Sequence, residues 1–565
     1  MTSMTNSHGS AASGSGAYRQ WFPAPYEEMR RSFRWQVPGR YNIAADVLDK
    51  HDPSRLAMLW EDWEGRERRL TFGDMQALTG RTANALRAYG VGEGDRVAVM
   101  LPPLPESAAT FLAAYKLGAI LLSLSVLYGD DAIVHRLGDC SAKVIVTNAE
   151  NRQRIERVRG ELPDLEHVLV VDEDFGQAVA RASDRFETLD TPADQACQIY
   201  YTSGTTGLAK GIVHAHRYLL AHNEFEFLHD VRDDEVFHST GEWAWIAGII
   251  PGLLGPWRHG APIAVFARKG GYDPAETLHV LEKYKVRNLF ATPTALRAMA
   301  ALGDVSSARP DLCLRRAVAG GEPLNPGVIS WFTEQFGVPV MDLYGLSESY
   351  PLCSNFPTLD IRPGSMGKPT PGWDVQILDD DEQPLPAGEI GELCLRARQN
   401  PHYPLGYWNR PEDSHRVFGG QWFHTHDTAR LDEDGYVWYE GRNDDVIISA
   451  GYRIGPFEVE SALVAHPQVV EAAAIASPDL RRGHVVKAFV RVLPGVETSS
   501  ELANEIQLFV RDRLSAYAYP RAIEFVDDLP KTLTGKIRRI ELRQRETEAA
   551  DVERASPPDH AVAVA

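Results

Sequence analysis

The densest cluster of residues that could do chemistry is a loop rich in glycine and hydroxyl side chains. Residues 201–211 read Tyr-Thr-Ser-Gly-Thr-Thr-Gly-Leu-Ala-Lys-Gly and follow a strand-like run over Gln198–Tyr201. Glycines allow consecutive backbone N–H groups to turn toward one anion, the hydroxyls add donors, and Lys210 adds positive charge. The spacing is not that of a Walker A loop. The segment therefore predicts a phosphate-binding loop.

The overall charge of the chain would repel most anions. Its 565 residues include 58 Lys and Arg against 78 Asp and Glu, a formal net charge of -20 at pH 7. Proteins that bind nucleic acid or anionic membrane surfaces usually cluster Lys and Arg on one face. We therefore expect no nucleic-acid partner and no membrane insertion, and any anionic ligand must be captured by a local site.

The cysteines and the chain ends favour a cytoplasmic protein. The five cysteines are scattered and include no C-x-x-C pair, which predicts neither a disulfide framework nor a structural zinc site. Residues 1–17 lack the apolar core of a signal peptide and, like residues 546–565, are expected to be a disordered tail. The apolar stretch Ser107–Leu127 contains Lys116 and Gly118, which favour a buried helix and a following strand over a membrane span.

Elements that could position the loop follow an α/β pattern. Strand-like runs such as Arg96–Leu101 alternate with helix-period runs such as Ala108–Leu117 and Pro274–Tyr284, which predicts parallel sheets covered by helices, with ligands at the strand ends. Between about residues 364 and 440 the pattern changes to short strands and turns, typical of a small antiparallel region. A small α+β unit is expected after Arg442.

An acidic run in the antiparallel region invites a metal-site interpretation. Residues 379–382 read Asp-Asp-Asp-Glu. Because nothing nearby is expected to supply histidine or further ligands, a hairpin turn exposed to water is favoured.

Six motifs, in order, resemble the adenylate-forming superfamily, which includes acyl-CoA synthetases, firefly luciferase and peptide-synthetase adenylation domains. After the loop at 201–211 come Ala319–Leu324 (AGGEPL), Tyr344–Glu348 (YGLSE), Thr425–Asp427 (THD), Gly441–Asp444 (GRND) and Pro530–Lys536 (PKTLTGK). The resemblance implies an α/β N-terminal domain over residues 18–443, built from two α/β subdomains and a small β-barrel-like subdomain. A small mobile α+β domain would follow over residues 444–545, with its hinge at Asp444.

The resemblance also implies a two-step reaction that uses ATP, Mg²⁺ and coenzyme A. A carboxylate is a poor electrophile, so the acid would first form a mixed anhydride with AMP and release pyrophosphate, and a thiol would then attack the acyl-adenylate. Because the acid is already ionised near neutral pH, no general base is required, and catalysis depends on positioning and charge stabilisation.

The family's nucleotide roles fall on matching positions of this chain. By resemblance, the β and γ phosphates would be held by Ser203, Gly204, Thr205, Thr206, Gly207 and Lys210. Glu348, beside Ser347, would carry Mg²⁺. The adenine and its surroundings would be formed by Gly321, Glu322, Pro323, Asp342, Tyr344 and Gly345. Tyr344 would stack on the base, although ordinary core packing is the alternative.

The ribose site departs from the family pattern at one residue. Asp427 would accept hydrogen bonds from both ribose hydroxyls, assisted by Arg442. The family's usual Thr-Gly-Asp is Thr-His-Asp here, which leaves the local loop geometry open. Taken alone, His424 and His426 lie on one strand face and could bind a metal, but the nucleotide alignment is favoured.

The C-terminal motif supplies a cation that moves. Lys536 matches the family lysine that reaches the α-phosphate and the carboxylate when the small domain rotates in. A basic turn exposed to water is the alternative. In the second pose another face would border the thiol path, and Gly451, Tyr452 and Arg453 match that position.

A second segment of the sequence indicates the size of the acid substrate. Residues 237–248 resemble the acyl-pocket helix of short- and medium-chain acyl-CoA synthetases, and the pocket would be lined by Trp245, Ile246, Ala247, Gly345 and Leu346. Acetate-specific relatives carry a tryptophan where this chain has Gly345, so an acid larger than acetate is expected. Glu242 is displaced from the position of the aspartate that binds amino-acid substrates, which disfavours such substrates.

The acceptor is expected to be coenzyme A, because residues 478–490 resemble the acyl-CoA synthetase version of the small domain. The alternative is a free-standing enzyme that loads a separate carrier protein. A sensor that binds a nucleotide without chemistry is disfavoured, because it would not need the lysine of a swinging domain. The acid, the pathway and the oligomeric state, monomer or homodimer, stay open.

Overall fold

The computed structural model describes residues 25–202, 209–324, 326–396, 400–442, 445, 447–449, 452–479, 483–514, 518–532 and 535–546. Residues 1–17 and most of 546–565, predicted to be tails, lie outside this part, as do residues 203–207, Asp444 and Gly451. Glu546 is described: it accepts a hydrogen bond from Ser477 and pairs with Lys487. The C-terminal unit therefore includes at least one residue beyond its expected end.

The first sheet carries the strand that leads into the predicted phosphate loop. Its strand order is β18-β8-β7-β4-β3-β5-β6. The strands are β3 (Arg96–Met100), β4 (Ile120–Ser123), β5 (Val144–Thr147), β6 (His167–Val170), β7 (Ala196–Thr202), β8 (Lys210–Ala215) and β18 (Gly406–Tyr407). Strands β3 to β7 pair in parallel, and β7 pairs antiparallel with β8. Their apolar runs are buried, as expected for a sheet covered on both faces.

Helices cover this sheet between successive strands. They are α3 (Phe72–Ala88), α4 (Pro105–Lys116), α5 (Asp130–Asp139), α6 (Ala149–Val158) and α7 (Asp174–Arg181), with the 3₁₀ turns η2 (Arg159–Glu161) and η3 (His216–Ala221). Thr71 and Asp74 form a capping box at the start of α3, which satisfies free N–H groups of the first turn. Helix α4 ends before Gly118, whose φ is +66°, and β4 follows. The predicted helix, stop and strand are confirmed.

The second sheet has the order β15-β14-β13-β12-β11-β9-β10-β1-β2. Its strands are β1 (Leu56–Asp62), β2 (Glu67–Thr71), β9 (Phe237–Ser239), β10 (Ile263–Ala267), β11 (Asn288–Ala291), β12 (Arg316–Gly320), β13 (Val340–Leu346), β14 (Ser349–Ser354) and β15 (Lys368–Pro369). The strands from β1 to β13 in this order are parallel, and the edges are antiparallel. The carboxyl ends of β9, β11, β12 and β13 therefore meet at one edge, where ligands are expected.

Short helices and turns pack on the second sheet. The helices are α2 (Tyr26–Ser32), α8 (Glu224–Phe227), α9 (Ile246–Ile249), α10 (Gly255–Arg258), α11 (Pro274–Lys283), α12 (Pro293–Ala300) and α13 (Pro326–Phe336), and the π turns are η1 (Ala45–Asp49) and η4 (Ile250–Leu254). Prolines at the first turn of α11 and α12 fit positions whose N–H needs no helical partner.

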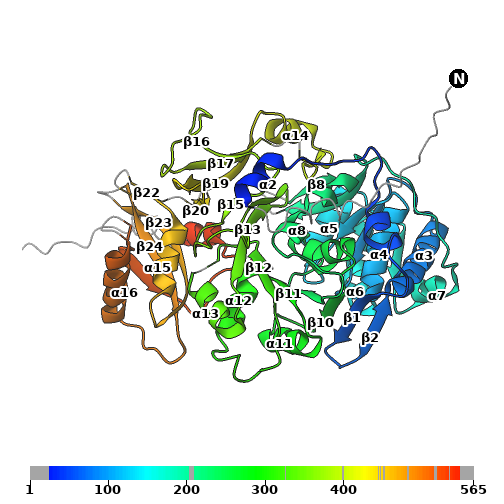
Figure 1. The fold of residues 1–565 in the computed structure, drawn as a ribbon, viewed down its shortest axis with the longest axis horizontal. Helices are drawn as coiled ribbons and strands as arrows, with labels where there is room; N and C mark the ends of the chain where they lie inside the picture. Colours follow the sequence, from blue (N-terminus) through cyan, green and yellow to red (C-terminus); the bar gives the residue numbers. More distant parts are fainter. Residues whose placement is uncertain are drawn as a thin grey trace, which may run out of the picture.

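Two smaller units complete the architecture (Figure 1). The antiparallel sheet has the order β16-β17-β19-β20, from β16 (Val375–Leu378), β17 (Gly391–Leu395), β19 (Phe423–Leu431) and β20 (Val437–Arg442), and α14 (Pro411–Phe418) packs beside it. The C-terminal unit contains β21 (Ile447–Ser449), β22 (Tyr452–Ile454), α15 (Pro456–Val464), β23 (Val469–Asp479), β24 (Gly483–Val492), α16 (Ser500–Arg513) and β25 (Ala522–Phe525). The predicted α/β class with a small α+β unit is confirmed.

The C-terminal unit lies at one end of the molecule, beside β20 and α13 (Figure 1). Tyr439 on β20 packs edge-on against Phe457, with ring centroids 6.0 Å apart. A Cβ at Gly441 would lie 2.8 Å from Pro456, so the two backbones approach closely. The first turn of α15 is thus the seam between the C-terminal unit and the rest of the protein.

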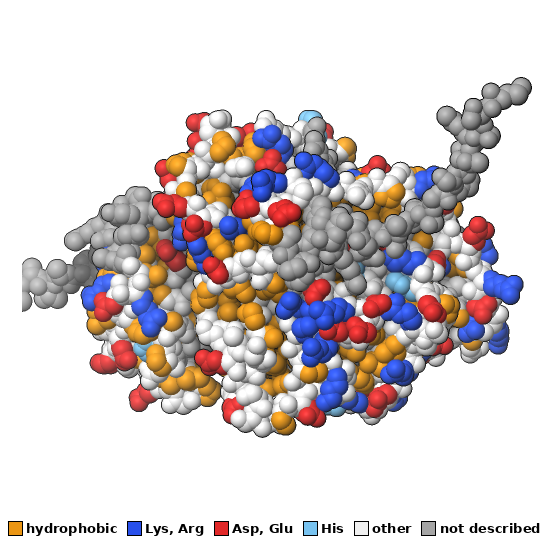
Figure 2. Space-filling model, viewed as in Figure 1, with side chains coloured by type: hydrophobic (Ala, Val, Ile, Leu, Met, Phe, Trp, Pro, Cys, Tyr) orange, Lys and Arg blue, Asp and Glu red, His pale blue; other side chains and the backbone are white. Residues whose placement is uncertain are grey.

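The surface carries charges of both signs. Figure 2 shows Asp and Glu side chains beside the Lys and Arg side chains over this face. Among the helices of the described residues, none is both long and apolar enough to cross a bilayer.

Candidate active site

The predicted ribose site is formed where β13 meets the antiparallel sheet. The Tyr344 hydroxyl donates a 2.6 Å hydrogen bond to Asp427 Oδ2. Asp427 and Arg442 are cross-strand partners on β19 and β20, and their side chains approach to 3.7 Å. Burial, followed by the Asp427 charge, raises the pKa of Tyr344 well above its usual value. One hydrogen bond and one ion pair therefore bring Tyr344, Asp427 and Arg442 into one group.

The turn before Asp427 explains the family's preference for glycine. His426 has φ of +59°, in the left-handed region that glycine occupies without strain. Its backbone N–H donates to Glu392 Oε1, and its imidazole is 65% exposed. Thr425 Oγ1 accepts the Asp427 N–H and donates to the Leu393 carbonyl. The open question about the histidine is answered: the turn keeps a positive φ, with the larger side chain directed outward.

Glu348 lies in an environment that suits a cation. Burial is the main cause that raises the pKa of its carboxyl, the Asp427 charge raises it further, and Arg442 opposes the rise. Tyr407 hydrogen-bonds the same carboxylate. Two carboxylates thus face one arginine, and a divalent ion would relieve the excess negative charge. The donor set fits Mg²⁺, which prefers carboxylate oxygens.

Two buried histidines hold the backbone on which Glu348 lies. His214 Nε2 is 2.9 Å from the Ser347 carbonyl oxygen, and His402 Nδ1 is 3.3 Å from that of Glu348. The two rings lie edge to face, with centroids 4.8 Å apart. Burial lowers the pKa of His214 to about 3 and that of His402 well below its usual value. Both imidazoles are therefore neutral near pH 7, and each can donate one N–H to its carbonyl.

Lys210 has two partners in the structure. Its ammonium lies 2.9 Å from Asp413 on α14 and 5.4 Å from the centroid of the Tyr407 ring. Thr202 and Lys210 are cross-strand partners, so the predicted phosphate loop is the connection of the β7–β8 hairpin. The strand predicted before the loop is confirmed, whereas Ser203, Gly204, Thr205, Thr206 and Gly207 lie outside the described residues.

The turn that carries Lys536 rests on the N-terminal part of the chain. Lys536 N–H donates to Thr532 Oγ1 and closes the turn. The neighbouring Gly535 has φ of +88°, and a Cβ there would lie 2.9 Å from Thr294 Oγ1. Thr294 in turn donates to the Glu322 carboxylate, which also pairs with Arg297 at 2.7 Å. Lys536 itself is exposed. The structure thus brings the lysine turn next to the predicted adenine segment.

The predicted acyl segment leaves the end of β9 and folds tightly. A Cβ at Gly248 would lie 1.7 Å from the Glu242 carbonyl oxygen, so only glycine fits there. Trp245 caps α9, packs edge-on against Tyr128, and joins the cluster that contains Ala209 at the end of the predicted phosphate loop. Ile246 is buried, and Ala247 is half-buried. The segment is therefore connected through packed side chains to the hairpin that carries the loop.

Three other predicted residues, Asp342, Gly345 and Leu346, lie on β13 near Tyr344. Asp342 is buried within β13, accepts the Leu343 N–H, and has a pKa raised to about 7 by burial. A Cβ at Gly345 would lie 2.5 Å from the Tyr350 ring, so the tyrosine fills the direction in which a larger side chain would start. Leu346 packs with Tyr344 in the core beneath the antiparallel sheet. Of Tyr452 and Arg453, the structure describes the backbone, in β22.

The sequence missed the residues that reach the site from elsewhere, namely Thr294, His214, His402, Tyr407 and Asp413. They belong to none of the six motifs, and their contacts arise only when separate elements pack together.

The acidic run at residues 379–382 forms the predicted turn, in which Asp379 accepts backbone N–H groups. The reason given for that prediction, that no histidine lies nearby, was wrong. In space, a histidine lies close to this turn, because His424 Nε2 is 3.4 Å from Glu382 Oε1.

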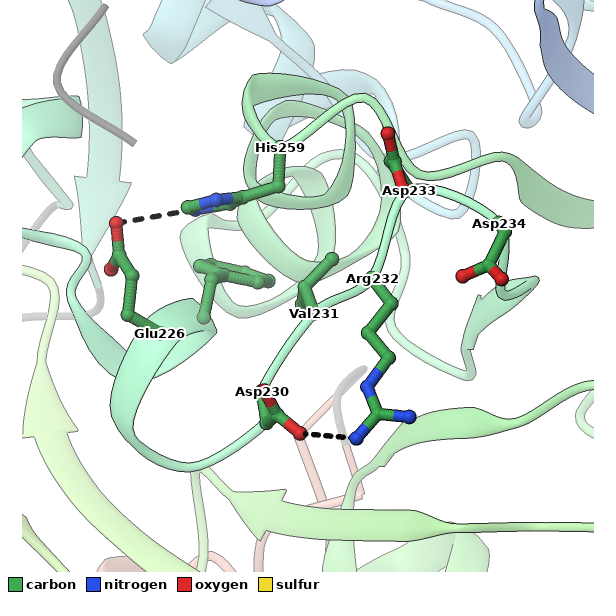
Figure 3. Close-up of a pocket in the computed structure, with 8 residues that line it drawn as sticks. Glu226, Asp230, Val231, Arg232, Asp233, Asp234 and His259 are labelled. Atoms are coloured by element: carbon green, nitrogen blue, oxygen red, sulfur yellow. Dashed lines mark hydrogen bonds and ion pairs between the residues drawn. The ribbon is translucent and has the colours of Figure 1, made fainter. Parts of the chain in front are cut away.

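A cavity of about 380 Å³ lies apart from this group (Figure 3). Glu226 and His259 approach to 3.5 Å in its wall, and Asp230 pairs with Arg232 at the rim. Burial raises the pKa of Glu226 to about 7. None of the predicted site residues lines this cavity.

Comparison with known proteins identifies the family of the chain. The family model described as AMP-binding enzyme matches residues 46–408, and the AMP-binding enzyme C-terminal domain matches residues 458–536. The chain is 36% identical to an acetyl-coenzyme A synthetase of Bacillus subtilis, over 92% of this chain and 94% of the relative. It is 35% identical to the mitochondrial acyl-coenzyme A synthetase ACSM3 of Mus musculus, over 92% and 93%.

Solved structures give the same result. An anthranilate CoA ligase in complex with anthranoyl-AMP matches with a TM-score of 0.85 and 33% identity, over 91% of this chain and 99% of the other. An acyl-CoA synthetase of Brucella canis matches with a TM-score of 0.72 and 35% identity, over 93% and 99%. The chain therefore belongs to the AMP-binding enzyme family and is an adenylate-forming, AMP-forming ligase of the acyl-CoA synthetase type.

Proposed function

We propose that this enzyme activates a carboxylic acid larger than acetate with MgATP and transfers the acyl group to coenzyme A. In the first step an acid oxygen attacks the α-phosphorus of ATP, the bond to the bridging oxygen breaks, and pyrophosphate leaves. In the second step the CoA sulfur attacks the acyl carbon, its proton is lost to solvent, and AMP leaves. The observation that carries the proposal is the Lys536 turn seated on Thr294, beside Glu322.

Each residue of the group has a defined task in this proposal. Asp427 binds the ribose hydroxyls through its carboxylate, and the Tyr344 hydrogen bond fixes that carboxylate and holds the aromatic ring at the base. Arg442, 3.7 Å from Asp427, would assist at the ribose or at the α-phosphate. When ATP binds, Lys210 leaves its ion pair with Asp413 and pairs with the β and γ phosphates. Glu348 would hold the Mg²⁺ that accompanies ATP and neutralises phosphate charge.

Lys536 provides the charge that changes between the two steps. From its turn beside Glu322, the side chain extends to the α-phosphate and the acid, where negative charge moves in the transition state. Rotation about Asp444 then withdraws it and brings Gly451, Tyr452 and Arg453 to the thiol path, with residues 18–443 and 444–545 as the two moving bodies. Asp445, next to that hinge, pairs with Arg539 and Arg543 of the C-terminal unit.

The acid is proposed from the pocket segment. Gly345 stands where acetate-specific relatives carry a tryptophan, which supports a larger acid, although the Tyr350 ring takes part of that direction. Relatives differ in the acid that they name: acetyl-coenzyme A synthetase in one, anthranilate and benzoate CoA ligases among the solved structures. A panel of C2 to C12, branched, hydroxy and aryl acids, scored by CoA consumption, distinguishes them. Product formed only with a carrier protein would instead favour the carrier-loading alternative.

The two-step proposal is tested by Lys536→Ala in separate half-reactions. Pyrophosphate release from ATP plus acid should fall by at least about 100-fold, since one preorganised charge contributes about 3–4 kcal/mol to the transition state. Transfer from a supplied acyl-adenylate to CoA should stay within about threefold of the wild type. Lys531→Ala, which removes a lysine of the same turn that pairs with Glu471, is the matched control. Equal loss of both half-reactions would contradict the two poses.

A further inference from the structure

A second cluster of ligating side chains lies on the outer face of the antiparallel sheet. Cys394 on β17 is the cross-strand partner of His424 on β19, and Glu392 lies two residues before the cysteine on the same face. One oxygen, sulfur or nitrogen atom of each residue lies within 4.8 Å of the other two. The His424 Nδ1 atom is 3.4 Å from Cys394 Sγ and 3.0 Å from Glu392 Oε2.

The burial of the three residues suits an ion held at the surface. Cys394 is fully buried and packs with Leu378 and Trp422. The side chains of His424 and Glu392 are 34% and 19% exposed, so the space between them is open to solvent. An ion could enter past the imidazole and the carboxylate and reach the thiol beneath them.

The same three atoms can form hydrogen bonds or bind an ion. The His424 Nδ1 atom carries at most one hydrogen, which it can donate to the Glu392 carboxylate, and its contact with the sulfur is weak. With the thiol ionised, the thiolate, the imidazole nitrogen and a carboxylate oxygen are three Lewis bases close to one another. In a tetrahedral zinc site, bonds of about 2.0–2.3 Å put neighbouring ligand atoms roughly 3.3–3.7 Å apart. The distance from Nδ1 to Sγ is 3.4 Å, that from Nδ1 to Glu392 Oε2 is 3.0 Å, and the sulfur and the carboxylate are within 4.8 Å.

Two further residues complete the surroundings. Glu382, in the acidic turn, is 3.4 Å from His424 Nε2, the nitrogen on the far side of the ring. Carboxylates in this position orient metal-binding imidazoles and fix their tautomer. His426 Nδ1 lies 3.5 Å from Glu392 Oε1, and its ring is exposed. Among the described residues, the mutually close ligand atoms are those of Glu392, Cys394 and His424, so His426 lies beside this group and not within it.

We propose that Glu392, Cys394 and His424 bind one Zn²⁺-type ion, with water as the fourth ligand and Glu382 orienting His424. The mixture of thiolate, imidazole and carboxylate favours zinc over Mg²⁺ or Ca²⁺, which take oxygen ligands. Burial, with the neighbouring glutamates, raises the pKa of the Cys394 thiol, so binding must release its proton. The site is separate from the ATP-dependent chemistry proposed above and does not depend on it.

The site would fix the turn that precedes the ribose carboxylate. Glu392 accepts the N–H of His426, and Asp427 is the next residue. An ion bound to Glu392 and His424 would fix both the carboxylate that accepts the His426 N–H and the strand residue that leads into the left-handed turn. Zinc is thereby expected to rigidify the Asp427 loop without touching the nucleotide.

Cobalt titration of the metal-free full-length protein tests the proposal. Co²⁺ should bind at one equivalent with the near-ultraviolet thiolate-to-cobalt band and the visible bands of tetrahedral coordination, and one equivalent of Zn²⁺ should remove them. Cys394→Ser should abolish the thiolate band. The matched control is Cys313→Ser, which removes another free cysteine that is partly exposed and hydrogen-bonded to the Val286 carbonyl. That variant should keep the band.

A second variant keeps the test decisive if loss of the buried thiol disturbs folding. His424→Gln replaces a partly exposed ring and should weaken Co²⁺ binding at least about tenfold while the thermal midpoint stays within about 2 °C. Three results would overturn the proposal: no thiolate band, a band that persists in Cys394→Ser, or a band that is lost in Cys313→Ser.

Discussion

At the scale of single residues, the site depends on buried neutral groups as much as on charged ones. His214 and His402 lie beneath Ser347 and Glu348 and hold two successive carbonyls. A neutral imidazole N–H satisfies a buried carbonyl without adding charge beneath a carboxylate that already faces Asp427. The position of the Glu348 carboxylate therefore depends on hydrogen bonds to its backbone, from residues that do not touch the nucleotide.

Replacing His214 should show this positioning effect. His214→Ala removes the hydrogen bond to the Ser347 carbonyl and should lower kcat of adenylation about 10–100-fold, with a smaller change in KM for ATP. His216→Ala is the matched control, because His216, the first residue of η3, is equally buried but accepts the Ile43 N–H instead. Pyrophosphate release at varied Mg²⁺ measures both variants. If the two variants lose activity equally, His214 contributes packing alone.

The sequence motifs indicated residues that the structure brings together, while their roles at the nucleotide stay predictions. The Asp427 and Tyr344 motifs were found in this way, and the structure joins them by a hydrogen bond. Sequence spacing could not reveal Thr294, which meets the Lys536 turn only because the end of β11 lies beside that of β12. It also hid the approach of Glu382 to His424, because that contact needs the acidic turn to fold over β17 and β19.

At the scale of elements, the site residues lie at one edge of the second sheet. This is the edge where β9, β11, β12 and β13 end. Parallel pairing places the acyl segment after β9, Thr294 after β11 and Glu322 after β12 on the same side of the sheet. The order of these strands in the sheet required tertiary structure, because β9 inserts between β10 and β11.

The contact between the lysine turn and Thr294 can be tested with two glycine-to-alanine substitutions. Gly535→Ala adds a methyl group 2.9 Å from Thr294 Oγ1 at a left-handed φ, so it should obstruct the pose that carries Lys536 inward. Adenylation should fall about tenfold or more, while transfer from a supplied acyl-adenylate is spared. Gly495→Ala is the control, because Gly495 has φ of +85° with open space around its Cβ position. An equal effect of both substitutions would assign the loss to backbone strain.

At the scale of the whole molecule, the seam between the two parts of the chain contains a pair of carboxylates. Glu440 on β20 and Glu458 on α15 repel each other across it, and Arg430 donates to Glu440 at 2.8 Å. Burial, followed by the Glu440 charge, raises the pKa of Glu458 to about 7. The packed seam therefore favours the protonated form of Glu458.

Because the pKa of Glu458 is raised in the packed seam, the packing of the two parts of the chain should depend on pH. Compared with a solvent-exposed glutamate of pKa near 4.5, Glu458 in the packed seam binds more protons between pH 4.5 and 7. Packing is thus most favourable below pH 4.5 and weakens as pH rises toward 7, by at most about tenfold in the closed-to-open ratio per pH unit. Above pH 7 the ratio should level off.

Glu458→Gln should remove this dependence, because the amide does not ionise. In small-angle scattering or in energy transfer between labels on the two parts, the wild-type protein should open between pH 5 and 7.5, while the variant stays closed. The control is Glu505→Gln on α16, an exposed glutamate away from the seam, and it should behave like the wild type. A variant that opened over the same pH range as the wild type would show that another group governs the seam.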